Sequence, residues 1–172
     1  MDILNRLEKI QGEKMLQKRL NYYFQEAQKH IDKIQKANRV LDKVIPIDIS
    51  TLETLSEQQQ DKLDILAFRF SKLQDLIGDK IFRNILEYSG VNTQQPFIGL
   101  LSELEREGIL DLNRWITLRN ARNKIAHEYP DNEDNLTSSI NFIYENSSYL
   151  VELIERLERY FDEVTSKRNR AD

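Results

Sequence analysis

The chain has 172 residues and a net charge of −4, and 31% of its residues are charged while only five are glycine and three are proline. This composition predicts one mostly helical globular domain, and the acidic balance argues against an indiscriminate nucleic-acid binder, which usually displays a large basic surface. The absence of cysteine excludes disulfides and thiolate sites, and the two histidines lie far apart, so a histidine-rich metal centre is not expected.

The distribution of apolar and charged residues also indicates the cellular location of the protein. The stretch MDILNRLEKIQGEK is charged from its second residue and has no signal-peptide core. No apolar run approaches the length of a membrane span, and no glycine-rich phosphate loop or paired-carboxylate motif occurs. We therefore expect a cytoplasmic protein that neither enters a membrane nor needs a cofactor or metal.

The first predicted element is a long helix that ends before Pro46, because proline breaks helix interiors. Its apolar residues recur at three- and four-residue steps: Leu16, Leu20, Tyr23, Ala27, Ile31, Ile34 and Leu41. Ile3, Leu7 and Ile10 have the same spacing in a different phase, with Gly12 between the two sets. We therefore expect a short leading helical segment over residues 1–15, ahead of the long helix.

Residues 46–58, PIDISTLETLSEQ, read as a connector, and a second long helix follows that ends near Gly90. Its apolar positions are Leu63, Leu66, Phe70, Leu73, Ile77, Ile81 and Ile85. After a loop over 91–96, FIGLLSELEREG predicts a short helix with Gly108 at its C-terminal cap.

Asp111 can cap the next helix, which contains LRNARNKIAHEYP (118–130) and stops near Pro130. The last helix has a regular apolar seam: Leu136, Ile140, Ile143, Ser147, Leu150, Ile154, Leu157, Phe161 and Val164. The sum is an all-α antiparallel bundle of four to five helices over 16–166. A basic tail over 167–172 is expected to fray.

The helix before Pro130 contains the candidate functional residues. From Leu112 to His127 it has no acidic residue, although the protein as a whole is acidic. Four basic residues lie in this window: Arg114, Arg119, Arg122 and Lys124. A helical wheel puts a core-facing arc beside a polar patch. The arc is Trp115, Leu118, Ala121 and Ile125, and the patch contains Arg122, Arg119, Asn123 and His127.

An arginine and a histidine on one patch suit metal-independent RNA cleavage, in which a ribose 2′-OH attacks its own phosphate. Arginine supplies fixed charge for the phosphorane, and histidine can move a proton near neutral pH. The reaction needs an acid and a base on opposite sides of the phosphorus, and one arginine–histidine pair does not supply both. We therefore expect a homodimer that brings two copies of the pair together. The alternative is a structural helix terminus, since helix ends favour basic residues.

Arg122-Asn-Lys-Ile-Ala-His127-Glu-Tyr129 resembles the R-x4-H-x-Y signature of HEPN-domain proteins, specifically the HepT-like branch. The second helix, DILAFRFSKLQDLIGDKIF, also resembles the corresponding helix of that family in its apolar and aromatic pattern. The resemblance covers about residues 16–162. It implies an all-α homodimer whose two motifs meet in a cleft at the subunit interface.

The same resemblance implies a ribonuclease toxin of a toxin–antitoxin module, with RNA as its substrate. The partner would be a minimal nucleotidyltransferase of the MntA type, which neutralises the toxin by transferring AMP to the motif tyrosine. Arg122 would stabilise the scissile phosphate, His127 would be the acid/base, Asn123 would orient one of them, and Tyr129 would accept AMP. Arg119 lies outside the signature and is assigned a lesser phosphate-binding role.

Two alternatives remain open at this stage. Some HEPN relatives are non-catalytic companions that bind substrate or nucleotide for a nucleotidyltransferase, and a plain helical interaction module would need no site at all. The leading segment and the loop after Pro46 also make the chain longer than a compact HepT.

Other polar or aromatic residues favour structural roles. His30 is expected at the surface or its boundary, and Trp115 in core packing and not as a base-stacking platform. Asp75, Asp79 and Glu87 of the second helix could face the basic patch and hold Arg122, although charged residues there are usually solvated.

Overall fold

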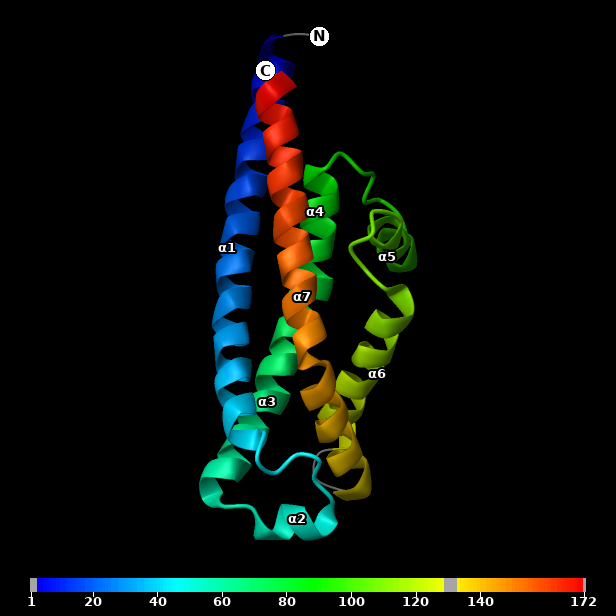
Figure 1. Cartoon of the computed structure of the whole chain (residues 1–172). Helices are drawn as coiled ribbons and strands as arrows, with labels where there is room; N and C mark the ends of the chain where they lie inside the picture. Colours follow the sequence, from blue (N-terminus) through cyan, green and yellow to red (C-terminus); the bar gives the residue numbers. More distant parts are fainter. Residues whose placement is uncertain (1–2, 129–132, 172) are drawn as a thin grey trace.

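The computed structural model of the chain describes residues 3–128 and 133–171, with the side chains of 127, 128, 133–135 and 171 left aside (Figure 1). Within these ranges every regular element is a helix, which confirms the all-α prediction. The helices are α1 (Ile3–Leu41), α2 (Ile49–Thr54), α3 (Glu57–Leu76), the π-helical turn η1 (Ile77–Ile81), α4 (Phe82–Tyr88), α5 (Phe97–Arg106), α6 (Leu112–Glu128) and α7 (Glu133–Ala171).

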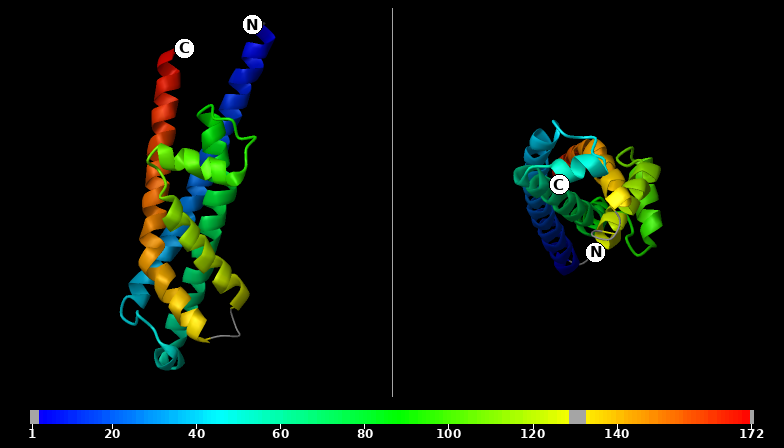
Figure 2. Two further views of the ribbon diagram at one scale, coloured as in Figure 1. Left: turned by 90° about the vertical axis from the view of Figure 1, so that its right-hand side faces the viewer. Right: turned by 90° about the horizontal axis from the view of Figure 1, so that it is seen from below.

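The two longest helices, α1 and α7, have 39 residues each and run in opposite directions along the length of the molecule (Figure 1). Helix α3 continues through η1 into α4 and packs against α1, while α6 runs back beside the first half of α7. Helix α5 lies across the direction of the others, next to α4 and α6 (Figure 2). This arrangement places α6 opposite the middle of the α3–η1–α4 helix.

Helix α1 is continuous through Gly12, so the expected leading segment is joined to the long helix. A glycine inside a helix costs about 0.5–1 kcal/mol relative to alanine, which is not enough to interrupt it. The different phase of the apolar residues before Gly12 appears instead in how far their side chains are exposed. The side chains of Ile3 and Leu7 are 77% and 54% exposed, and the first fully buried residue of α1 is Leu20.

The connector after Pro46 contains the short helix α2, which the sequence analysis did not predict. Asp48 caps it by accepting hydrogen bonds from the Thr51 amide at 2.7 Å and from the hydroxyls of Ser50 and Thr51 at 2.8 Å. These hydrogen bonds, led by that of the Thr51 amide, lower the pKa of the Asp48 carboxyl to about 2. The cap supplies an acceptor for the Thr51 amide, which has no partner within so short a helix.

The predicted second helix extends from Glu57 to Tyr88 and contains one π-turn, η1. Ser56 begins it with a capping box, in which the side chains of Ser56 and Gln59 each bind the other's backbone amide. The apolar positions Leu73, Ile77, Ile81 and Ile85 are all buried although they follow consecutive four-residue steps. An α-helix would rotate such a series off its face, and the extra residue of a π-turn brings it back.

The predicted caps of the next two helices are confirmed. Gly108 follows α5 with φ at +72°, and the amides of Gly108 and Ile109 donate to the carbonyls of Glu105 and Leu104. The Asp111 carboxylate accepts from the Arg114 amide at 2.9 Å at the start of α6. The core-facing arc of α6 is buried as predicted: Trp115, Leu118, Ala121 and Ile125.

The basic tail differs from the expectation of fraying, because α7 stays helical through Ala171. Arg168 anchors it: Nη1 pairs with the Glu13 carboxylate at 2.5 Å, and Nη2 donates to the Tyr88 carbonyl at 2.5 Å. The guanidinium also lies 4.8 Å from the centre of the Tyr88 ring. Among the described residues, no helix has a stretch that is long and apolar enough to cross a membrane.

Candidate functional site

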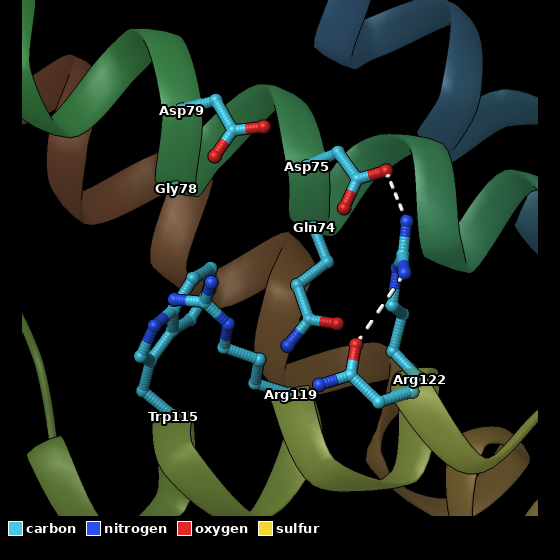
Figure 3. A pocket seen from close by; sticks show the side chains of 8 residues that line it. Gln74, Asp75, Gly78, Asp79, Trp115, Arg119 and Arg122 are labelled. Atoms are coloured by element: carbon cyan, nitrogen blue, oxygen red, sulfur yellow. Dashed lines mark hydrogen bonds and ion pairs between the residues drawn. The ribbon is translucent and has the colours of Figure 1, made fainter. Parts of the chain in front are cut away.

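A polar cavity of about 250 Å³ lies between the α3–η1 segment and α6, on the side where the basic patch was predicted (Figure 3). Gly78 and Trp115 form part of its wall. Its other lining residues are all polar: Gln74, Asp75, Asp79, Arg119, Arg122 and Asn123. The two aspartates and two arginines balance in charge, so the cavity suits a ligand that carries little net charge or a single phosphate.

Arg122 crosses the cavity from α6 to α3 and is held there by Asp75. Its Nη2 donates to Asp75 Oδ2 at 2.7 Å, with side-chain exposures of 28% and 38% for the two partners. Among the three carboxylates that could have held Arg122, Asp75 is therefore the one in contact. Arg122 Nη1 donates to Asn123 Oδ1 at 3.4 Å, a long and therefore weak hydrogen bond.

Arg119 lies on the same wall, one turn before Asn123. Its guanidinium carbon sits 5.5 Å from the centre of the Phe97 ring at the start of α5. In the part of the chain that the structure describes, it has no salt bridge. A guanidinium supported by a ring on one side can present its other side to a ligand.

Of the motif histidine and tyrosine, the structure describes only the backbone of His127. The backbone of His127 belongs to the last turn of α6, five residues after Arg122. The His127 side chain and Tyr129 lie outside the described residues. Their roles, and that of Asn123 in orienting one of them, stay predictions.

Gln74 is the main residue of the cavity that the sequence analysis missed. Its side chain is 3% exposed, and neither its oxygen nor its nitrogen has a hydrogen-bond partner among the described residues. A signal was present in the sequence: Gln74 lies four residues after Phe70 and three before Ile77, both buried on α3 and η1. A polar residue at a buried position of the helical repeat usually has a polar partner or lines a cavity, and Gln74 lines the cavity.

Trp115 packs in the core as predicted, but its polar edge also belongs to the site. The side chain is 1% exposed, and its ring centre lies 4.8 Å from that of Phe82. Trp115 Nε1 is buried without a hydrogen-bond partner among the described residues. The indole therefore combines a packed ring that lines the cavity with a buried donor that has no acceptor among the described residues.

The π-turn brings Gly78 against this indole. A Cβ atom on Gly78 would lie 3.1 Å from Trp115 Cζ2, closer than ordinary van der Waals contact. Glycine thus lets the α3–η1 helix and α6 approach each other next to the cavity. π-turns occur frequently at functional sites.

The remaining basic residues of α6 point elsewhere. The Arg114 guanidinium carbon lies 4.2 Å from the centre of the Tyr149 ring, and Nη2 is 3.4 Å from Asn146 Oδ1. The Tyr149 hydroxyl accepts from the Asp111 amide at 3.1 Å, and burial raises its pKa. Lys124 lines a separate groove between α6 and α7. The predicted basic window therefore divides into Arg119 and Arg122 at the cavity and two residues away from it.

His30 lies at the boundary of the molecule, as predicted, and outside the lining of the cavity. Its Nδ1 is 3.3 Å from Arg69 Nη1, and burial followed by the charge of Arg69 lowers its pKa below the usual value. Among the described residues, no group of three histidines or carboxylates is arranged to hold a metal ion.

Comparisons of this chain with models of protein families, with curated proteins and with solved structures found no match.

Proposed function

We propose that the protein is a HEPN-type ribonuclease toxin that cleaves RNA without a metal, as a homodimer of four- to five-helix bundles. The observation that carries the proposal is the position of Arg122. It lies at a polar cavity, fixed by Asp75 at 2.7 Å, and precedes His127 by five residues on the same helix. The R-x4-H-x-Y resemblance supplies the reaction class.

In the proposed reaction the ribose 2′-oxygen attacks the adjacent phosphorus while the bond from phosphorus to the 5′-oxygen breaks. One His127 takes the proton of the 2′-OH, and a protonated His127 from the partner subunit donates a proton to the leaving 5′-oxygen. Arg122 stabilises the extra negative charge of the phosphorane. The products are a 2′,3′-cyclic phosphate and a free 5′-hydroxyl.

Asp75 acts as a positioning residue in this scheme. It accepts from Nη2 of the Arg122 guanidinium and fixes its direction, while Nη1 makes only the long contact to Asn123 Oδ1, which a phosphate oxygen would replace. The carboxylate also balances the arginine until a phosphate arrives. Arg119, one turn away and without a carboxylate partner among the described residues, would guide the phosphate group.

The proposed control is covalent. A cognate MntA-like nucleotidyltransferase would transfer AMP to Tyr129, two residues after His127. The added nucleotide puts bulk and negative charge where the RNA phosphate must bind. Intact mass measured after incubation with that enzyme and ATP tests this: the protein should gain one AMP, and Tyr129→Phe should gain none.

A second candidate is a non-catalytic subunit that binds a nucleotide for such a transferase. The unpartnered amide of Gln74 favours it, because a buried polar cavity can bind a ligand without cutting it.

RNA cleavage in excess EDTA separates the two candidates. We expect wild type to cut single-stranded RNA, with losses of about 10²–10⁴-fold for His127→Ala and about 10²–10³-fold for Arg122→Ala. Arg114→Ala is the matched control, since this arginine lies on the same helix but over Tyr149. RNA left intact by unmodified wild type, or cut by both motif variants as fast as by wild type, would exclude the ribonuclease.

A further inference from the structure

The cavity between α3–η1 and α6 concentrates unsatisfied polar atoms. Across the described residues, five buried side-chain atoms lack a hydrogen-bond partner, and four of them belong to cavity residues: Gln74 Oε1 and Nε2, Trp115 Nε1 and Arg122 Nε. Native proteins pair nearly all such atoms. Their clustering in one place indicates a ligand that brings the partners.

Gln74 has the geometry of a group that recognises a planar edge. Its amide is 97% buried, and Figure 3 shows the side chain extending from α3 toward α6 between Arg119 and Arg122. A carboxamide presents an acceptor and a donor side by side in one plane. Nucleobases carry the complementary donor and acceptor side by side, which is why amide side chains read base edges.

The neighbours of Gln74 complete a recess for a base. The Trp115 Nε1–H is a further fixed donor, and Asp79 offers acceptors that lack a salt bridge among the described residues. Arg119, whose guanidinium carbon lies 5.5 Å from the centre of the Phe97 ring, adds a cation beside the recess for the phosphate of the same nucleotide. The glycine at position 78 admits the indole to this wall, where a Cβ would come within 3.1 Å.

The charges limit what else the ligand carries. Asp75 and Asp79 offset Arg119 and Arg122, so a triphosphate would meet as many carboxylates as guanidiniums. A single phosphate can lie at the arginine side while the base enters toward Gln74. One nucleotide unit, either free or within an RNA strand, meets this description.

We propose that Gln74 reads the base of a nucleotide whose phosphate lies at Arg119 and Arg122, with Trp115 Nε1 as a second contact. This rests on the proposed function only for the source of the nucleotide: in a ribonuclease the base belongs to the RNA residue beside the scissile phosphate. The recess then sets sequence preference, and the motif performs the cleavage.

Trp115 is the only tryptophan in the chain, so its fluorescence reports the recess directly. The full-length protein is titrated with AMP, GMP, CMP and UMP, and with inorganic phosphate for comparison. We expect a saturable change with at least one nucleotide and a clear ranking among the four. Gln74→Met, which keeps the length of the side chain but removes the amide, should lower the affinity for the best-bound nucleotide by about tenfold or more.

Gln58→Met is the matched control, because it makes the same change on an exposed turn of α3. It should bind like wild type, and circular dichroism verifies that both variants fold. The proposal is overturned if no nucleotide gives a saturable change in wild type. It is also overturned if Gln74→Met binds all four as wild type does, or if phosphate alone reproduces the change.

A second arm identifies the source of the nucleotide. Cleavage sites are sequenced after digestion of a randomised RNA oligonucleotide. If the bound base is part of RNA, wild type shows a base preference beside the cut and Gln74→Met reduces it by about tenfold, matching the affinity change. If mononucleotides bind in a way that depends on Gln74 but no RNA is cleaved, the ligand is a free nucleotide and the ribonuclease proposal is wrong. The two proposals can therefore fail separately.

Discussion

The two faces of the α3–η1–α4 helix follow different rules. Toward α1, a buried polar residue is satisfied: Asn84 accepts from Arg19 at 3.2 Å and donates to the Lys80 carbonyl at 2.7 Å. Toward α6, Gln74 is buried as deeply, but neither polar atom of its amide has a partner among the described residues. The polar residue that faces α1 is paired within the fold, whereas the one that faces α6 is left unpaired among the described residues. Binding of the proposed nucleotide there would separate stability and binding on a single helix.

The largest expected effect tests the completed interior. Phe70 is fully buried on α3, one turn before Gln74. Phe70→Ala should lower the free energy of unfolding by about 3–5 kcal/mol, because it removes a large side chain and leaves a cavity. Urea or guanidinium unfolding measures this. A loss below about 1 kcal/mol would mean that this stretch of α3 is loosely packed.

The next effect should have the opposite sign. Gln74→Met replaces an unpartnered buried amide with an apolar side chain of similar length, so it should raise the free energy of unfolding by about 1–2 kcal/mol in the ligand-free protein. The same denaturant titration applies, with Gln58→Met as the neutral control. A destabilised Gln74→Met would show that the amide already contributes to the free fold and would erase the contrast between the faces.

A smaller loss is expected at the close approach of η1 and α6. In Gly78→Ala the new methyl gains about 0.5–1 kcal/mol of helix propensity, but it meets Trp115 at 3.1 Å and costs about 1–3 kcal/mol of overpacking. The net loss should be about 1 kcal/mol, seen as a lower melting temperature together with altered Trp115 fluorescence. Gly12→Ala, with nothing within 4 Å of its Cβ, should instead stabilise. A stabilised Gly78→Ala would mean that the indole yields easily.

The smallest effect is expected at His30 of α1, which contacts Arg69 of α3. Burial and then Arg69 lower its pKa, with Lys72 acting in the same sense and Glu26 in the opposite one. The folded protein therefore disfavours the charged form. Stability from this group should be full above the unfolded pKa of about 6.5 and should decline as the pH falls toward the lower folded value, by less than about 1 kcal/mol. His30→Gln should flatten this part of the pH profile of melting temperature, and an unchanged slope would assign it to other groups.

Periodicity and capping residues were sufficient to predict most of the helices. The buried arc of α6 and the caps at Gly108 and Asp111 follow from local spacing, which a helix expresses whatever its neighbours do. Helix α2 was missed because its cap is made by Asp48 and two hydroxyls within a stretch that has no apolar period.

The site was less predictable because it depends on contacts between distant segments. Arg122 was found from its motif, but Asp75 is 47 residues away and was one of three possible carboxylates. Gln74 was missed, since the sequence marks it only as a polar residue in a buried phase and does not indicate which helix it faces. The π-turn could be predicted only if the four apolar positions at four-residue steps were already known to lie on one buried face.

Arg168 has a consequence for the order in which the molecule comes apart. One guanidinium ties α7 to Glu13 of α1 and to the end of α4 at Tyr88. The exposed turns of α1 that precede Glu13 are not held by these contacts and can unfold alone. The part of α1 that follows Glu13 can open only if α1, α4 and α7 separate together. Amide hydrogens should therefore exchange in two steps along α1, with the boundary set by a side chain that lies 155 residues further along the chain.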